Sequence, residues 1–185
     1  NIYLSTLINS QTPLDGRLAL EVALNILQMP KLQGLNLQVK WPNDLYSQQG
    51  KRGGILVEPL STHQAIVGVG INLFTPESQD PLQPISSLTD FGLNNLDRME
   101  VIAQLYLAIQ QAAQWFEHGC YNLAERFNHH AAFMQELVHF EHHQGQVTGH
   151  FEGINQEGAV LISTDGQQQA FYQGRMRRIA VQDNQ

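Results

Sequence analysis

The hydrophobic pattern of the chain changes near residue 135, and this change limits the possible folds more than any other feature. Before it, apolar residues recur at helical spacing over two long segments and one shorter one. After it, short strand-like segments alternate with turns at Gln144-Gly145, Glu157-Gly158 and Asp165-Gly166. Because glycine readily supplies the positive φ that tight hairpins need, we expect five short strands in a small β-barrel. We therefore predict two domains, at residues 1–135 and 136–185.

The first of these domains has the alternating pattern of an α/β fold. Strands are expected at residues 2–8, 37–41, 55–57 and 65–73. Helices are expected at residues 14–29, from Asp97 to Gly119, and at 121–132, with Asp97 and Glu100 as a capping pair. Three prolines between residues 75 and 84 indicate a loop. This order of elements predicts a mixed sheet covered by helices.

Composition excludes several classes of protein. The chain of 185 residues is 42% hydrophobic and 15% charged, which is typical of a folded globular protein. Its net charge of −7 argues against binding nucleic acid over the whole surface. No apolar run approaches the roughly 20 residues of a membrane span. The only basic cluster is formed by Arg175, Arg177 and Arg178, and it could simply be the solvated face of a last strand.

The single cysteine and the first residues indicate the cellular setting. Cys120 cannot form an internal disulfide, so we expect a reducing, cytoplasmic compartment. No motif surrounds it, and a packed thiol is a better interpretation than a nucleophile. The chain begins without Met, and its first residues already have a strand pattern with no visible signal peptide. We therefore expect that a segment has been cut from its start.

Three short motifs carry the residues suited to chemistry. Residues 40–45, Lys-Trp-Pro-Asn-Asp-Leu, place polar side chains at a strand end, where α/β proteins bind ligands. Residues 51–58, Lys-Arg-Gly-Gly-Ile-Leu-Val-Glu, place a cation just before paired glycines, an arrangement suited to an anion. Residues 68–72, Gly-Val-Gly-Ile-Asn, leave room for a flat ligand beside an amide. Taken singly, each motif is more often a turn, a tight bend or close packing.

Taken together, in this order and spacing, the three motifs resemble those of biotin protein ligases. The resemblance continues in Ser86-Ser87-Leu88, in the capped helix from Asp97 and in a C-terminal barrel that ends near Gly174. It implies a biotin/lipoate ligase type of sheet followed by an SH3-like barrel. It also implies an enzyme that joins biotin to ATP with Mg²⁺, forming biotinyl-5′-adenylate, and then transfers biotin to a lysine of a biotin carboxyl carrier domain.

The resemblance assigns roles to individual residues of this chain. It implies that Lys51 is catalytic and contacts both biotin and the reacting phosphate, and that Gly54 and Gly68 line the biotin site. Residues on the nucleotide side would be Asn43, Asp44, Asn72 and an arginine from the barrel, Arg177 or Arg178.

The chain departs from the family pattern in two places. The family's Gly-Arg-Gly-Arg loop, and the serine, threonine and glutamine that contact biotin, fall before the first residue of this chain. Some members stack adenine on a tryptophan where this chain has Ile85, so we expect an apolar contact there. Eight histidines, among them His129, His130 and His139, suggest no metal site, because no cysteine or carboxylate completes a ligand set.

Two alternatives stay open on the sequence. One is a lipoate ligase-like acyltransferase, which the tight motifs and the barrel disfavour. The other is a biotin-responsive transcriptional repressor, which would need a DNA-binding domain that residues 1–185 do not contain. A homodimer is compatible with the sequence but nothing in it requires one.

Overall fold

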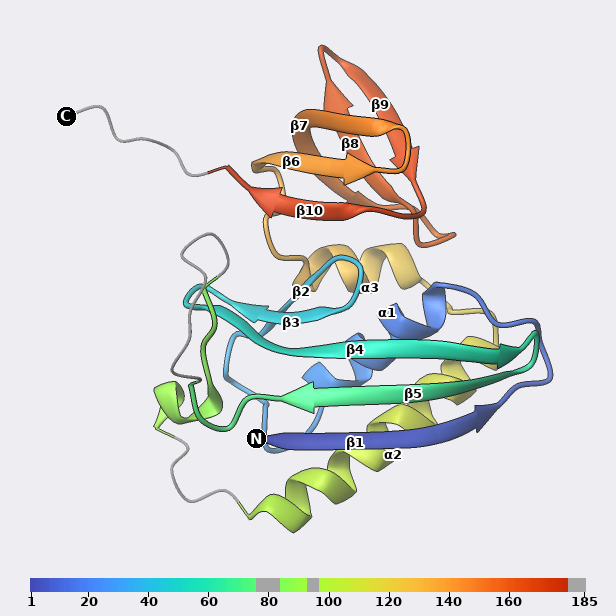
Figure 1. Cartoon of the computed structure of the whole chain (residues 1–185), viewed down its shortest axis with the longest axis vertical. Coiled ribbons are helices and arrows are strands. Elements are labelled where there is room, and N and C mark those ends of the chain that lie inside the picture. The colour runs from blue at the N-terminus through green and yellow to red at the C-terminus, as the bar shows by residue number, and fades with distance from the viewer. Residues whose placement is uncertain (76–83, 93–96, 180–185) are drawn as a thin grey trace.

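The computed structural model describes residues 1–75, 84–92 and 97–179. Two five-stranded sheets dominate the structure (Figure 1). The first has the strand order β1-β5-β4-β3-β2, and every neighbouring pair in it is antiparallel. Its strands are β1 (Ile2–Asn9), β2 (Gln38–Lys40), β3 (Asp44–Ser47), β4 (Gly50–Ser61) and β5 (Gln64–Ile71). Among the described residues, parallel pairing is limited to two isolated bridges, Val39 with Ala131 and Lys51 with Ile85.

Helices cover only one face of this sheet (Figure 1). Helix α1 (Arg17–Leu27) and the long helix α2 (Arg98–Glu117) pack against each other and against β4 and β1. Along β5, Ala65, Val67, Val69 and Ile71 are buried, whereas the alternate residues are partly exposed. A strand turns successive side chains to opposite faces. The glycines of β5 therefore lie on the face that the helices leave open.

The ends of the two long helices follow from local chemistry. The Asp97 carboxylate accepts hydrogen bonds from the backbone N–H groups of Met99 and Glu100, as the sequence predicted. The Glu100 side chain pairs with Lys31 and does not close a capping box. Helix α1 ends at Leu27, two residues before the predicted Met29, because a residue that precedes proline disfavours helical backbone.

A β-bulge interrupts the pairing of β3 with β4. Tyr46 pairs with Lys51 and Leu45 pairs with Gly53, so Arg52 is the extra residue of the bulge. A bulge of this kind re-aims the side chains next to it. Here it allows Lys51 and Gly54, three residues apart, to lie on the same open face of the sheet.

The second sheet confirms the five strands predicted after residue 135. Its order is β10-β6-β7-β8-β9, again antiparallel, and it contains β6 (Leu137–His142), β7 (Gly145–Ile154), β8 (Val160–Thr164), β9 (Gln167–Phe171) and β10 (Arg175–Arg178). Its core contains the buried side chains of Phe140, Phe151, Ile162 and Met176. Within the described residues no pairing of β9 with β10 closes the sheet, so the SH3-like barrel is an open one.

Buried side chains join the two sheets into one core. The Trp41 indole N–H donates to the Gly158 carbonyl at 3.1 Å, and its ring lies 5.8 Å from that of Phe140. Helix α3 (Leu123–His130) contacts β2 on one side and β7 on the other. Its Asn128 amide exchanges hydrogen bonds with the backbone of Ile154. The barrel is thus packed directly on the hairpin that carries the first motif.

Several predicted boundaries are wrong. Strand β4 covers twelve residues instead of the predicted 55–57, because it pairs with β5 along most of its length despite its glycines and Pro59. Strand β3 was missed altogether. Helices α1 and α3 are each shorter than predicted at both ends. Most of the predicted loop between residues 75 and 84 lies outside the described residues.

A buried ion pair lies beneath α1, close to the single cysteine. Glu21 is completely buried, and its carboxylate accepts hydrogen bonds from both terminal nitrogens of Arg126. The Arg126 guanidinium also lies 4.3 Å from the centre of the Trp115 ring. Burial, together with the Glu21 charge, raises the pKa of the Cys120 thiol to about 12. Cys120 is therefore a packed thiol, as predicted, and not an activated nucleophile.

Of the helices that the structure describes, none has the length and apolar character to cross a membrane.

Candidate functional site

A cavity of about 330 Å³ opens on the face of the first sheet that the helices leave uncovered. Its walls come from residues 3–5 of β1, from Asn43 and Asp44 at the β2–β3 turn, from Lys51 and residues 54–56 of β4, and from residues 68–70 of β5. Two of the three predicted motifs contribute their polar residues here, and the third contributes its glycines. The sheet thus brings together residues that are up to 67 positions apart in the chain (Tyr3 to Gly70).

The floor of the cavity is flat because glycines form it. A Cβ atom added at Gly68 would have its nearest neighbour, Ser5 Oγ, at 3.7 Å, and one at Gly70 would meet the Tyr3 ring at 3.4 Å. A Cβ at Gly54 would meet Lys51 Nζ at 3.4 Å. Gly53 differs, because a Cβ there would lie 2.3 Å from the Gly70 carbonyl oxygen. Only one of the paired glycines therefore faces the cavity, and the other permits close strand packing.

Asp44 holds two ammonium groups at the edge of the cavity. Its Oδ1 lies 2.7 Å from Lys51 Nζ and its Oδ2 lies 3.8 Å from Lys40 Nζ. The Lys51 side chain is 34% exposed, so its ammonium can reach a ligand in the cavity, whereas Lys40 is buried. Burial lowers the pKa of Lys40, and the Asp44 carboxylate opposes that effect. The sequence interpretation named Lys51 and Asp44 but gave Lys40 no role.

The two candidate asparagines use their amide nitrogens within the protein. Asn43 Nδ2 donates to the Ile55 carbonyl at 2.7 Å, which ties the β2–β3 turn to β4. Asn72 Nδ2 donates to the carbonyls of Lys51 and Ser86, at 3.5 and 3.3 Å. Asn43 lines the cavity, but Asn72 lies behind the Lys51 backbone and does not line it. Both side chains position the strands around the site.

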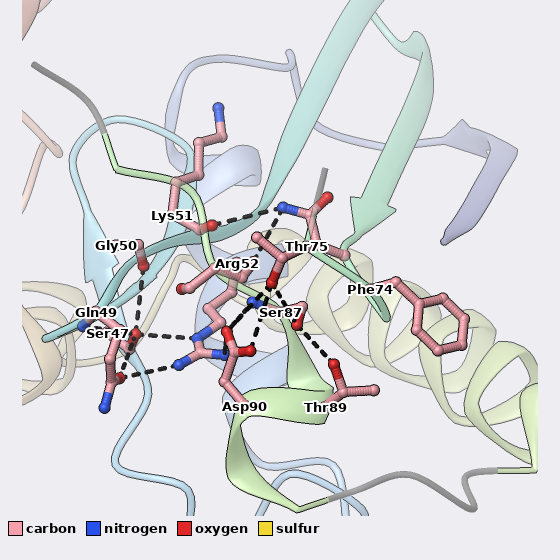
Figure 2. Close-up of polar contacts among 12 residues, drawn as sticks. Ser47, Gln49, Gly50, Lys51, Arg52, Phe74, Thr75, Ser87, Thr89 and Asp90 are labelled. Atoms are coloured by element: carbon pink, nitrogen blue, oxygen red, sulfur yellow. Dashed lines mark hydrogen bonds and ion pairs between the residues drawn. The ribbon is translucent and has the colours of Figure 1, made fainter. Parts of the chain in front are cut away.

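Arg52 is the most buried charged side chain near the site, and the sequence interpretation assigned it no role. It is 1% exposed, and its guanidinium donates to Ser47 Oγ, Gln49 Oε1 and Asp90 Oδ2 (Figure 2). Burial lowers its pKa, while the bond to Asp90 raises it. The available signal was an arginine between a lysine and two glycines, at the start of an apolar strand, where a solvated side chain is unexpected.

The basic cluster on β10 lies on the side of the barrel that faces the first sheet (Figure 1). The positive charges of Arg175 and Arg177 both contribute to lowering the pKa of Lys40. Arg178 pairs with Glu136 at 2.6 Å, and its charge acts on Tyr46 instead. The cluster therefore adds positive potential next to the Lys40–Asp44–Lys51 group, although neither Arg177 nor Arg178 lines the cavity.

Comparisons with known proteins agree with one another. A sequence model of the biotin/lipoate A/B protein ligase family matches residues 6–72, the segment that contains all three motifs. The bifunctional ligase/repressor BirA of Escherichia coli (strain K12) is 30% identical over 176 residues, which cover 90% of this chain and 54% of that protein. A biotin–[acetyl-CoA-carboxylase] ligase of Mycobacterium tuberculosis is 28% identical over 130 residues, covering 69% and 48%. The chain thus spans about half the length of these curated relatives.

Solved structures show the same fold over almost the whole chain. The biotin protein ligase from Aquifex aeolicus in complex with biotin and ATP has a TM-score of 0.79 and 25% identity, and the match covers 96% of this chain and 78% of that one. The Helicobacter pylori biotin acetyl coenzyme A carboxylase synthetase, solved with biotinylated ATP, has the same fold at a TM-score of 0.58. By its motifs, its sequence relatives and its fold, the chain is similar to the biotin protein ligases.

Proposed function

We propose that the protein containing this chain activates biotin with ATP and transfers it to a lysine of a biotin carboxyl carrier domain. The observation that carries the proposal is the Lys51 ammonium, held at 2.7 Å by Asp44 at the edge of a glycine-floored cavity. An apolar slot that ends in a fixed cation suits a flat, apolar molecule with one terminal carboxylate. The cytoplasm is the proposed compartment, in keeping with a single free cysteine.

Biotin would lie along the glycine floor of β4 and β5. The cavity volume of about 330 Å³ lies at the small end of the range for ligand pockets, roughly 300–1,000 Å³. Gly54, Gly68 and Gly70 leave space for the ring system, and the exposed side chain of Leu56 adds an apolar wall. Lys51 would then meet the carboxylate, where the reaction takes place.

ATP would approach from the side of the β2–β3 turn. Asn43 and Asp44 lie on that turn, and residues 85–88 run beside Lys51 and Asn72. Ile85 forms a bridge with Lys51, and its apolar side chain would contact the adenine, as the sequence led us to expect. Arg175 and Arg177 of β10 add positive potential for the phosphates.

In the first step a carboxylate oxygen of biotin attacks the α-phosphorus of ATP, and pyrophosphate leaves with the broken P–O bond. The Lys51 ammonium stabilises the negative charge that develops around the α-phosphate. Mg²⁺ would partly neutralise the phosphate charge. The part of the chain that the structure describes offers no group of three or more acidic, His or Cys ligands, so the ion would be held mainly by phosphate oxygens.

In the second step the amino group of the carrier lysine attacks the carboxyl carbon of the adenylate, and AMP leaves. The mixed anhydride must meanwhile be kept from water. The Asp44 carboxylate is engaged by Lys51 and Lys40, so it serves chiefly to hold the ammonium in place.

The lipoate alternative is not favoured, because one similar curated protein is named a biotin–[acetyl-CoA-carboxylase] ligase and a similar solved structure, that of a biotin protein ligase, contains biotin and ATP. Competition between biotin and lipoate in a pyrophosphate-release assay would test the choice directly. Escherichia coli BirA is named a ligase and repressor. A repressor activity here would depend on residues outside the chain, and the acidic charge of residues 1–185 offers nothing toward DNA binding.

The glycine floor can be tested by filling it. Gly68→Ala and Gly68→Val should both fold, because a Cβ at this position has no neighbour closer than 3.7 Å. We expect the KM for biotin to rise in steps, by about tenfold or more for valine, with the KM for ATP little changed, since each added methyl group occupies space that the ligand needs. Biotin-dependent pyrophosphate release measures both constants. The whole protein that contains this chain would contradict the proposed function if it showed no such release, and equal changes in both constants would contradict the assigned position of biotin.

The barrel arginines can be separated by single substitutions. Arg177→Ala should raise the KM for ATP several-fold and leave that for biotin unchanged, because its charge acts on the Lys40–Asp44–Lys51 group. Arg178→Ala is the matched control, since Arg178 is bound to Glu136 and lies 5.9 Å from the centre of the Phe133 ring. Each lost contact to a phosphate is worth roughly tenfold at most when the side chain is exposed. A larger effect from Arg178 would reverse the assignment.

A further inference from the structure

We propose that Arg52 is a positioning residue for Lys51, acting through the β-bulge of β4 and the ion pair with Asp90. The inference rests on the proposed function, because it concerns how the reactive lysine is held. Arg52 is the extra residue of the bulge, and its side chain is 1% exposed. In Figure 2 the Lys51 side chain extends to the opposite side of the strand from the Arg52 guanidinium. The bulge therefore directs one cation to the cavity and the other to the interior.

The interior contacts of Arg52 connect two segments that flank Lys51. On one side, Nε donates to Ser47 Oγ at 3.0 Å and Nη2 donates to Gln49 Oε1 at 2.9 Å, both in the β3–β4 turn. On the other side, Nη1 donates to Asp90 Oδ2 at 3.2 Å. Such a planar fork of donors suits a guanidinium, and a lysine could not reach all three acceptors.

Asp90 in turn fixes the segment that runs beside Lys51. Its carboxylate accepts the Ser87 backbone N–H at 2.7 Å and caps the short 3₁₀ helix η1 (Leu88–Phe91). That backbone hydrogen bond lowers the pKa of Asp90 more than any other contact, and Arg52 lowers it further. The carboxylate is therefore ionised at neutral pH and stays paired with the guanidinium.

The fixed segment holds both backbone groups of Lys51. The Lys51 N–H donates to the Pro84 carbonyl at 2.8 Å, and the Lys51 carbonyl accepts the Ser86 N–H at 2.9 Å. Asn72 Nδ2 donates to the same Lys51 carbonyl. Hydrogen bonds thus connect the bulge, through Arg52 and Asp90, to residues 84–87, and these residues in turn bond to the Lys51 backbone. Loss of the Arg52 side chain should weaken these connections and so change the orientation of the Lys51 ammonium.

The test measures single-turnover formation of biotinyl-adenylate in Arg52→Met, Lys51→Ala and the double variant. Methionine keeps apolar length in the interior, and the Asp90 side chain, at 39% exposed, can be solvated when its partner is lost. We expect Arg52→Met to be slower by roughly 10- to 100-fold, the range for a displaced catalytic group. The double variant should be within about twofold of Lys51→Ala, because residues that act as one unit are not additive. Rates that simply multiply would overturn the inference.

Two further variants keep the test decisive. Asp90→Asn leaves the interior intact. It should also slow the reaction, but by a smaller factor than Arg52→Met, since a neutral amide still accepts a hydrogen bond. Lys31→Met removes one member of a surface ion pair with Glu100 and should leave the rate unchanged. If Arg52→Met does not fold, an unchanged rate in Asp90→Asn would still overturn the inference.

Hydrogen exchange separates failure of the inference from failure of the proposed function. Failure of the whole protein that contains this chain to form the adenylate would contradict the function alone. The inference is then decided by the backbone amides of Lys51 and Ser86, which donate to the carbonyls of Pro84 and Lys51. We expect these amides to exchange about tenfold faster in Arg52→Met than in wild type, with amides of β1 unchanged. Equal exchange in both proteins would show that Arg52 does not hold Lys51.

Discussion

Lys51→Ala is expected to slow the formation of biotinyl-adenylate by roughly 10²–10³-fold, the loss that follows removal of one preorganised donor from a developing anion. The Lys51 ammonium is held by Asp44 at 2.7 Å, and its side chain remains 34% exposed toward the cavity. It is therefore fixed in direction before substrate arrives and needs little reorganisation during the reaction. Single-turnover measurement of the adenylate isolates this step from transfer to the carrier.

Two comparisons sharpen the Lys51 experiment. Lys51→Arg should rescue only part of the rate, because a planar guanidinium is wider than an ammonium. Lys31→Ala, at a surface ion pair with Glu100, should have no effect. A Lys51→Ala rate within about threefold of wild type, less than 1 kcal/mol, would mean that Lys51 only solvates the edge of the cavity.

Arg126→Ala is expected to lower the free energy of unfolding by about 3 kcal/mol or more, the loss typical when one partner of a buried ion pair is removed. The Glu21 side chain, on the buried side of α1, is completely buried, whereas the Arg126 side chain is 26% exposed. The substitution therefore leaves a carboxylate without its cation in the interior and also removes the contact with Trp115. Urea unfolding at neutral pH, followed by tryptophan fluorescence, measures the change.

A second ion pair of the same chemistry is the control for Arg126. Arg17 and Asp15 lie 2.7 Å apart at the start of α1, but neither side chain is buried, with exposed fractions of 31% and 46%. Arg17→Ala should therefore cost about 1 kcal/mol or less. Replacing both buried partners, in Glu21→Met with Arg126→Met, should recover most of the stability, because no charge is left unpaired. Equal losses in Arg17→Ala and Arg126→Ala would show that burial of Glu21 does not determine the effect.

The parts of the site that the sequence predicted are those coded by contiguous residues. Lys51, Asp44 and the glycines of β4 and β5 belong to short motifs, and the cavity contains them. The roles of Gly53 and Asn72 were not predictable in the same way, because they depend on which strand lies beside them. Gly53 packs against the Gly70 carbonyl, and Asn72 bonds to the Lys51 backbone. Individual ligand contacts of these residues stay predictions.

The bulge and the Arg52 contacts illustrate the same limit for the fold. Nothing in residues 44–54 reveals that the bulge falls at Arg52, since this depends on the register with β3, a strand that was itself missed. The hairpin turns of the barrel were easier to predict. Asp165 and Gly166 both adopt positive φ, and the Asp-Gly pair indicates this from two adjacent residues alone. Sequence patterns thus predict turns well, and long-range pairing poorly.

The hydrogen bond from Trp41 to Gly158 spans 117 residues and links the first motif to a turn of the barrel. The neighbouring residues of that motif, Asn43 and Asp44, line the cavity. A substitution in the 155–158 turn can therefore shift the residues that line the cavity, although the turn itself does not line it. In evolution the hairpin and the barrel turn are expected to vary together. A barrel taken from a distant relative would support the cavity only if one of its carbonyls lay where the Gly158 carbonyl accepts the Trp41 indole N–H.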